Sequence, residues 1–443
     1  MNPTRSIATK SFLFFFSGFL LAAPPFDALF RPSEVLDRPS LDLKISVPSD
    51  YSPISAPGRK LKRIDLTYTS FEWAGEKWRH PCMVLLPERV APEYAGDAVV
   101  IAGNGSSPDG LPVRYAEAAA LMGIPALAIV GANPGPHYGG KNEGAVMARM
   151  EQKFLATGDP HWIGYAALGR VIVRAITAMQ AVPGVKAERF VVTGGSKRGM
   201  ASWIAAAADD RIVGAYPGAW NMANFEAALR LRAERQGLDY GKAGEGPASA
   251  TPRQQLASLE TPRGKEYQRF LDPWLWRDLV ANKPILFTVG ANDPLFPPLS
   301  DTVFLPDMPK TTRIMLIPNR GHGHDSERES AGWRMWMAHV FANRAVPDIA
   351  LTCKREPGTI QLSAAVKSPN PIKTVTAWSA SNERGNYLEC HWSPTVLTAH
   401  NGVWLATLPA PAGSYTAFFV EVEDEDARSG RGIISTGMQE IKP

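Results

Sequence analysis

Short, continuously apolar segments alternate with helical patterns along most of this chain, and this alternation limits the possible folds more than any other feature. The expected strands cover about 97–102, 126–130, 190–193, 213–216, 285–289 and 314–317, and the expected helices cover about 113–122, 142–156, 165–181, 197–208 and 328–343. Strands without polar alternation are buried on both faces, and helical crossovers make neighbouring strands parallel. The sequence therefore predicts an α/β protein with a mostly parallel sheet covered by helices.

Changes in residue composition divide the chain around this pattern. Residues 24–60 are rich in Pro and Ser and are expected to form an extended lead-in to an α/β domain over 61–347. An insertion at about 221–283 is largely helical, and it is either a cap over a site or a solvated surface excursion. From 349 to 443, short alternating strands punctuated by Pro and Gly predict a β-rich module similar to a sandwich.

The first 23 residues have the pattern of an export signal. Arg5 and Lys10 precede the apolar run 12–21, and two alanines follow it. The run is too short for a comfortable membrane span, so we expect no stable membrane insertion once the signal is removed. The alternative is a buried helix of the mature fold. Export would place the protein in the periplasm or outside the cell.

The charge balance and the cysteines restrict the partners and the redox chemistry. With 47 Lys and Arg against 43 Asp and Glu, the net charge is +4, which argues against nucleic acid or an anionic membrane as the main partner. An exported protein can keep a disulfide, so Cys353 and Cys390 could pair, or they could be buried free thiols. Cys82 is expected to be buried in a strand.

The most informative motif is a serine that stands between a strand and a helix. The apolar strand ending at Thr193 runs into Gly194-Gly195-Ser196, and an Ala-rich helix follows. A nucleophile elbow needs this context, because its sharp turn strains the backbone and glycines relieve the crowding. The usual pattern is G-x-S-x-G, whereas here Arg198 stands in place of the second glycine and Gly199 follows it. The alternative is a serine that only caps the helix.

Two later residues give this serine possible partners. Asp293 follows one expected strand and His322 follows the next, so the chain order is Ser, acid, His. All three stand at the carboxyl ends of strands, where parallel sheets build their sites. The serine needs a base to remove its proton, and the imidazole needs a carboxylate to orient it. Asp301 competes for the role of the acid, but it lies deeper in the next segment, in an expected helix or turn.

A second histidine, His324, follows closely. Gly321 gives the chain freedom to turn His322 over the edge of the sheet, whereas His324 stands beside Asp325 and is expected to start the last helix. We therefore predict that His322 lies between Ser196 and Asp293. His322, His324 and Asp325 could instead suggest a metal site, but zinc needs three or four converging ligands and no second cluster supplies them. We expect no metal ion and no cofactor.

Backbone N–H groups are expected to stabilise the oxyanion of such a site. Lys197, at the start of the helix, is the first candidate, and Asn104-Gly105 after the first parallel strand is the second, unless it is a simple turn. The leading hypothesis is an exported serine hydrolase that cleaves an ester or amide of a small molecule or peptide through an acyl-serine. The alternatives are a non-catalytic binding protein on the same scaffold and a metal-dependent hydrolase.

From about residue 60 to its end, the sequence resembles the PhoPQ-activated pathogenicity-related proteins, a bacterial family with an α/β-hydrolase fold. The matching stretches are 72–80, 154–162, 193–199, 272–278, 318–322 and 413–421. The most distinctive is Thr193-Gly-Gly-Ser-Lys-Arg-Gly199. The resemblance implies that Ser196 is the nucleophile, Asp293 the acid and His322 the base, and that Lys197-Arg198 is the usual form of this elbow. The elbow is also locally similar to that of glucuronoyl esterases.

Overall fold

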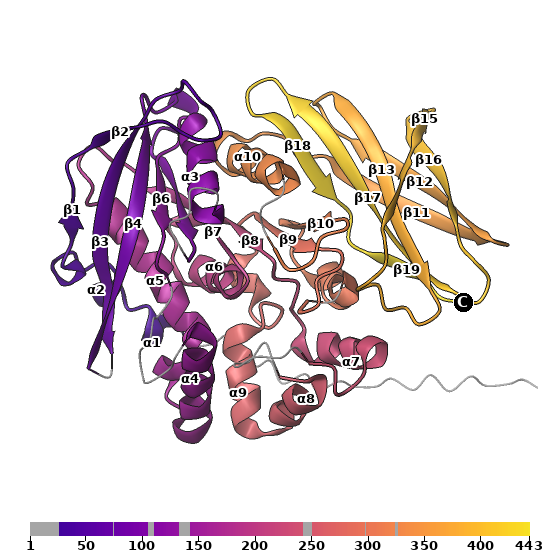
Figure 1. Cartoon of the computed structure of the whole chain (residues 1–443), viewed down its shortest axis with the longest axis horizontal. Helices are drawn as coiled ribbons and strands as arrows, with labels where there is room; N and C mark the ends of the chain where they lie inside the picture. Colours follow the sequence, from indigo (N-terminus) through magenta and orange to yellow (C-terminus); the bar gives the residue numbers. More distant parts are fainter. Residues whose placement is uncertain are drawn as a thin grey trace, which may run out of the picture.

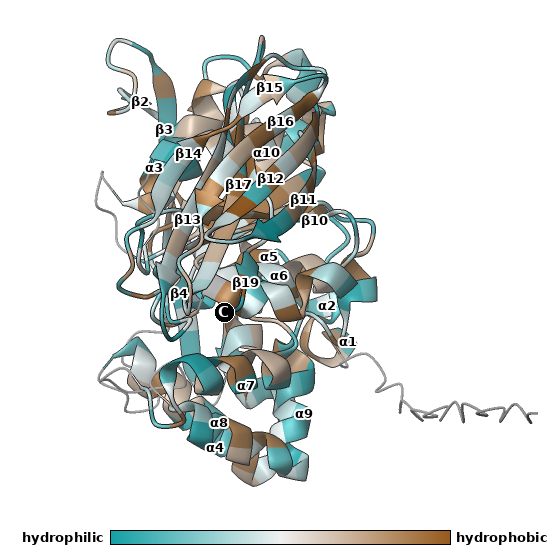
Figure 2. Ribbon diagram, turned by 90° about the vertical axis from the view of Figure 1, so that its right-hand side faces the viewer, coloured by the Kyte–Doolittle hydropathy of each residue, from teal (hydrophilic) through white to brown (hydrophobic). Residues whose placement is uncertain are grey.

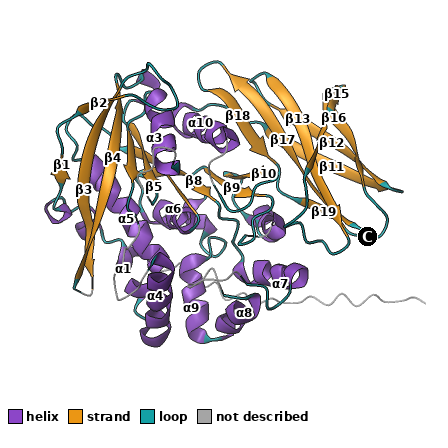
Figure 3. Ribbon diagram, in the orientation of Figure 1, coloured by secondary structure: helices purple, strands orange, loops and turns teal. Residues whose placement is uncertain are grey.

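A computed structural model describes residues 26–73, 75–104, 110–132, 142–241, 250–296, 298–323 and 327–443, drawn in Figures 1 and 3. The expected signal peptide, 1–23, lies outside these residues, as do Gly105 and His324. None of the described helices is both long enough and apolar enough to cross a membrane.

The large sheet carries the α/β pattern that the sequence predicts. The two-residue strand β1 (Lys44–Ile45) forms one edge. The strands that follow it in spatial order are β3 (Leu61–Trp73), β4 (Glu76–Pro87), β6 (Ala126–Ile129), β5 (Asp97–Ala102), β7 (Arg189–Gly195), β8 (Ile212–Gly218), β9 (Ile285–Gly290) and β10 (Thr312–Ile317). β3 and β4 are antiparallel, and every neighbouring pair from β6 to β10 is parallel. With helices on both faces, this is the predicted α/β-hydrolase fold.

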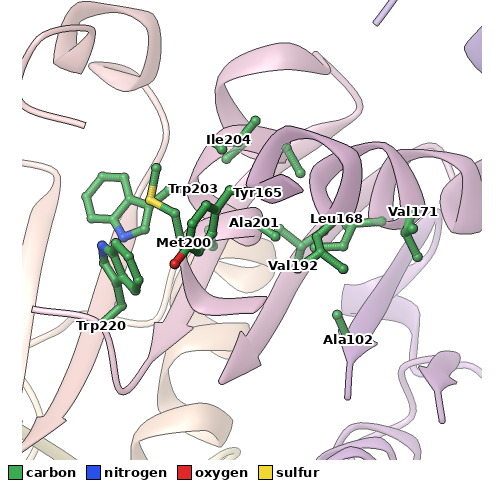
Figure 4. Close-up of a cluster of buried hydrophobic side chains, with 14 of the residues drawn as sticks. Ala102, Tyr165, Leu168, Val171, Val192, Met200, Ala201, Trp203, Ile204 and Trp220 are labelled. Atoms are coloured by element: carbon green, nitrogen blue, oxygen red, sulfur yellow. The ribbon is translucent and has the colours of Figure 1, made fainter. Parts of the chain in front are cut away.

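Two pairs of helices cover the two faces of the sheet. Helices α5 (Gly164–Met179) and α6 (Lys197–Ala208) pack on one face, and α3 (Leu111–Leu121) and α10 (Glu327–Ala342) pack on the other. Successive side chains of β5 point to opposite faces of the sheet. Val100 therefore joins the core under α5 and α6, whereas Val99 joins the core under α3 and α10. Figure 4 shows side chains of α5 and α6 packed over Val192 of β7.

The lead-in is more structured than the sequence suggested. It forms α1 (Phe26–Leu29), α2 (Pro32–Val35), the 3₁₀ turn η1 (Pro39–Leu41), β1 (Lys44–Ile45) and β2 (Ser49–Tyr51). Its apolar side chains, among them Phe26 and Leu41, are buried in the core. Arg174 of α5 fixes the segment by donating hydrogen bonds to the carbonyl oxygens of Glu34, Val35 and Asp37 at 2.7–2.9 Å. The expected extended lead-in is therefore wrong: Pro and Ser delimit short helices whose apolar residues join the core.

The C-terminal strands form a sandwich, one sheet of which continues the large sheet. β18 (Gly430–Ser435) pairs with β10, and β17 (Tyr415–Asp426), β13 (Ile372–Asn382) and β14 (Ser393–Val396) extend the sheet beyond it, with β19 (Gln439–Ile441) beside β17. The outer sheet contains β11 (Asp348–Glu356), β12 (Thr359–Lys367), β16 (Val403–Pro409) and β15 (Thr398–His400). The sequence did not predict this continuity between module and hydrolase domain.

The three cysteines are free. Cys82 is buried on β4, as predicted, whereas Cys353 is exposed on β11 and Cys390 is partly buried in the loop before β14. The Sγ of Cys390 accepts a hydrogen bond from Nδ2 of Asn382 at 3.4 Å. Both expectations for Cys353 and Cys390, a disulfide or two buried thiols, are therefore wrong.

The insertion after β8 is helical and lies at one end of the sheet. It contains α7 (Phe225–Gln236), α8 (Pro252–Glu260), α9 (Pro262–Leu271) and the 3₁₀ turn η6 (Arg277–Val280), and α4 (Glu143–Thr157) joins this group in Figures 1 and 2. Asp272 connects its two ends, because this fully buried carboxylate accepts hydrogen bonds from the backbone N–H groups of Asn224 and Phe225 at 2.7 and 2.8 Å.

Candidate active site

Ser196 occupies a strained turn between β7 and α6. Its backbone angles are φ 57° and ψ −121°, a conformation that L-residues rarely adopt. The two flanking glycines make the turn possible. A Cβ on Gly194 would lie 2.5 Å from Cβ of Arg198, and a Cβ on Gly199 would lie 2.5 Å from the carbonyl oxygen of Gly218. Gly199 thus provides the close approach to β8, and Gly194 leaves room for the side chain at position 198.

The two cations after the serine are paired with one carboxylate. Arg198 is 8% exposed and donates a hydrogen bond to Glu143, at the start of α4. Nζ of Lys197 lies 3.4 Å from the same carboxylate. Burial lowers the pKa of Arg198, and the charge of Glu143 opposes this shift. The two cations thereby attach the first turn of α6 to α4. Their partner is distant in sequence, so the local pattern could not reveal it.

Asp293 and His322 are brought together at the carboxyl ends of β9 and β10. Oδ2 of Asp293 lies 2.8 Å from Nδ1 of His322, and the carboxylate is completely buried. Its other oxygen accepts hydrogen bonds from the N–H groups of Leu295 and Phe296 at 2.8 and 3.1 Å, which fix its orientation. Asp301 instead lies in the 3₁₀ turn η7 (Pro298–Val303) and accepts a hydrogen bond from the N–H of Met438. The geometry therefore favours Asp293 over Asp301 as the partner of the histidine.

Two asparagines attach the loops that carry these residues to the C-terminal module. Nδ2 of Asn292 donates to the carbonyl oxygens of Tyr387, Leu388 and Cys390 at 2.8–3.1 Å. The amide of Asn319 makes two hydrogen bonds with the backbone of Trp392, at 2.8 and 2.9 Å. Neither asparagine was among the site residues predicted from the sequence. The available signal was an asparagine next to Asp293 and another three residues before His322.

The candidate oxyanion donors lie at the same edge of the sheet. Lys197 is the first residue of α6, and the first N–H groups of a helix have no acceptor within that helix. Asn104 is exposed just beyond β5 and forms a bridge with Gly131. Because β5 and β7 are neighbours, their ends meet beside Ser196. Gly105 is outside the described residues, so its expected role is untested.

A cavity of about 110 Å³ lies between the insertion and the edge of the sheet. One water needs about 10–15 Å³ on such a measure, so the cavity has room for a group of several heavy atoms. Its walls come from α4, α5, α7, α8, α9 and the segments after β8 and β9. Trp220 and Phe296 form the wall nearest the site, since the centroids of the Phe296 and His322 rings lie 5.7 Å apart. Figure 4 shows Trp220 beside Tyr165. Helices of the insertion line this cavity, and the insertion is called the cap below.

The described residues contain no cluster of three or more His, Cys, Asp or Glu side chains that could hold a metal ion. His324 and Asp325, which the sequence offered as ligands beside His322, are outside those residues.

Comparison with known proteins gives three kinds of similarity. A family model described as PhoPQ-activated pathogenicity-related protein matches residues 54–387. Autocrine proliferation repressor protein A from Dictyostelium discoideum is 24% identical over 405 residues, which cover 81% of this chain and 79% of that protein. Similar solved structures include an acetyl xylan esterase from Paenibacillus sp. R4, with 16% identity, TM-score 0.44, and coverage of 67% of this chain and 88% of the other. A glucuronoyl esterase from Teredinibacter turnerae T7901 is 17% identical, with a TM-score of 0.44. The match covers 69% of this chain and 79% of that esterase.

Proposed function

Because the chain belongs to the PhoPQ-activated pathogenicity-related protein family and has an α/β-hydrolase fold, we propose that it is a serine hydrolase. Its substrate would be an ester or amide of a small molecule or peptide. The observation that carries the proposal is the 2.8 Å hydrogen bond between buried Asp293 and His322. It lies at the edge of the sheet where Ser196 occupies its strained turn. A structural histidine would need no buried carboxylate there, and a helix-capping serine would need no positive φ.

The proposed reaction follows from the roles of these three groups. Nε2 of His322, the ring nitrogen not bonded to Asp293, takes the proton of Ser196 as Oγ attacks the substrate carbonyl. Asp293 holds the imidazole in the required tautomer and stabilises its cation. The N–H of Lys197, and that of Asn104 or Gly105, donate to the oxyanion. His322 then protonates the leaving group, and an activated water hydrolyses the acyl-serine.

Covalent labelling tests this proposal directly. A fluorophosphonate probe should label the wild type but not Ser196→Ala. His322→Ala should reduce the rate of labelling and of ester turnover by about 10⁴-fold, because the three residues act as a unit. Ser202→Ala is the matched control, since it removes a buried hydroxyl from the same helix whose hydrogen bond goes to the carbonyl oxygen of Arg198.

The competing functions predict different results. A non-catalytic binding protein would show neither labelling nor turnover in the wild type. A metal-dependent hydrolase would lose its activity in EDTA and would tolerate Ser196→Ala.

We also propose that the N-terminal segment directs export to the periplasm or the medium. Support comes from the charged start and the short apolar run of the sequence. Mass spectrometry of the protein from fractionated cells should find a mature chain that starts near residue 24. A cytoplasmic chain with residues 1–23 intact would contradict this proposal.

A further inference from the structure

One buried cation lines the cavity beneath the cap. Arg232, on α7, is 4% exposed, and its Nε donates to Oε1 of Gln236 at 3.2 Å. In the part of the chain that the structure describes, its Nη2 has no hydrogen-bond partner. A guanidinium remains charged in proteins, and a buried donor left unsatisfied costs free energy. This atom therefore needs an acceptor that the described protein does not supply.

The other walls of the cavity are largely apolar. Leu229 and Phe225 of α7, Tyr267 of α9 and Trp220 surround the space with aliphatic and aromatic surface. Glu151 of α4 also lines it, and burial raises the pKa of its carboxyl group to about 7. Glu151 is thus largely uncharged in mildly acidic solution. The groups that act on Arg232 are Tyr240, whose ring centroid lies 5.6 Å from Cζ of the guanidinium, and Asp293, whose charge opposes the lowering of the Arg232 pKa by burial. Neither of them bonds to Nη2. The cavity combines apolar walls with one unsatisfied cationic donor.

The cavity is also adjacent to the reacting groups. The rings of Trp220 and Phe296 lie 4.7 Å apart, and Phe296 contacts the His322 ring. On the other side, Trp220 packs against the first turn of α6, where a Cβ on Gly199 would lie 3.2 Å from Cβ of Trp220. Phe296 alone therefore separates a group held in the cavity from His322, and Trp220 alone separates it from the start of the Ser196 helix.

We propose that this cavity binds one apolar arm of the substrate, and that Arg232 binds a carboxylate carried by that arm. The proposal rests on the proposed hydrolase function and specifies its substrate class as esters or amides with an anionic, otherwise apolar arm. A carboxylate satisfies the guanidinium with two parallel hydrogen bonds, whereas the apolar walls exclude a strongly hydrated arm.

The test compares two probes of equal length that differ in charge, hexanoate and hexanamide. Their binding to the Ser196→Ala variant is measured by calorimetry, so that turnover plays no part. We expect hexanoate to bind about tenfold or more tightly than hexanamide, because hydrogen bonds to charged groups are the stronger kind. Arg232→Met should remove this preference. Arg230→Met is the control, because it removes an exposed guanidinium from the same helix.

A second variant keeps the proposal testable if Arg232→Met does not fold. Leu259→Trp leaves Arg232 in place and fills the cavity from α8, so both probes should lose binding. Equal affinity for the two probes, or unchanged binding in Leu259→Trp, would overturn the inference. Fluorophosphonate labelling of the wild type is measured in parallel. If the wild type is labelled but hexanoate is not preferred over hexanamide, only the arm proposal is contradicted. If hexanoate is preferred but the wild type is not labelled, the hydrolase function is contradicted, and with it the role of the cavity as a substrate site.

Discussion

The helical cap and the C-terminal β module both border the candidate active site, but they contact it with different chemistry. The module reaches the loops of Asp293 and His322 through the amides of Asn292 and Asn319, which bond to backbone atoms. The cap reaches the site through an apolar and aromatic layer, in which Phe225 of α7 packs on Trp220 and Trp220 packs on Phe296. Backbone hydrogen bonds demand one geometry, whereas apolar walls tolerate substitutions of similar volume.

This difference assigns a separate task to each region. The module fixes where the acid and the base stand, so changes in it should alter stability or the rate of the chemical step. The cap forms the space beside them, so changes in it should alter which substrates bind. The following four predictions test this division.

The largest expected effect is on the attachment of the module. Arg344 and Asp424 form a 2.6 Å ion pair and are 3% and 0% exposed. Arg344→Ala would leave the Asp424 carboxylate buried without this partner, which should lower the free energy of unfolding by about 3–5 kcal/mol. Chemical denaturation measures this loss. The control Arg431→Ala breaks the more exposed pair with Glu423 and should cost about 1 kcal/mol or less. Equal losses of unfolding free energy in the two variants would show that burial does not determine how much the Arg344–Asp424 pair stabilises the fold.

The second effect is on catalysis. Asn292→Ala should lower kcat by about 10- to 100-fold with little change in KM, because a small misplacement of the acid impairs the chemical step. The kcat of Asn292→Asp should be no higher than that of Asn292→Ala, since a carboxylate cannot donate hydrogen bonds to the three carbonyl oxygens. Steady-state kinetics with a neutral ester measures both. Asn401→Gly is the control, because Asn401 lies in an exposed turn of the module at a positive φ that glycine also adopts. Full activity in Asn292→Asp would refute a positioning role.

The third effect belongs to the cap. Phe225 is partly buried and lines the cavity. Phe225→Leu should change KM for esters with bulky arms by about 3- to 10-fold and leave kcat nearly unchanged, because it alters only apolar contacts. A series of 4-nitrophenyl esters of increasing arm length measures the change. A fall in kcat with constant KM for every ester would place the cap among the parts that orient the reacting groups.

The smallest effect is a pH dependence in the cap. The pKa of Glu151 is raised to about 7 by burial, so this group is mostly neutral at pH 6 and mostly ionised at pH 8. Hexanoate stays ionised over this range. Its binding should therefore weaken by about threefold between these pH values as the two carboxylates repel each other. Calorimetry at both pH values measures this, and Glu151→Gln should remove the dependence whereas exposed Glu226→Gln should not.

The sequence predicted the elements whose signals are local. Strands such as the one predicted at 285–289 were recognisable because they are apolar without alternation. The chain order of Ser196, Asp293 and His322 indicated the site. The missed features join segments that are distant in the chain. Glu143 pairs with Arg198 from another helix, Asn292 bonds to residues near 390, and β18 pairs with β10. No periodicity or spacing within either segment encodes such a contact, because each depends on how the whole chain packs.

The pairing of β10 with β18 has a consequence for how the protein is made. Synthesis proceeds from the N-terminus, so β10 exists as an open edge until the chain has grown from Ile314 to Ser435, its partner across the ladder. The loop that holds Asn292 and Asn319 also appears late, at 387–392. A ribosome-bound chain that ends near residue 350 would thus already contain Ser196, Asp293 and His322. It would still lack the groups that set the last two in position, and it would expose a strand edge prone to aggregation.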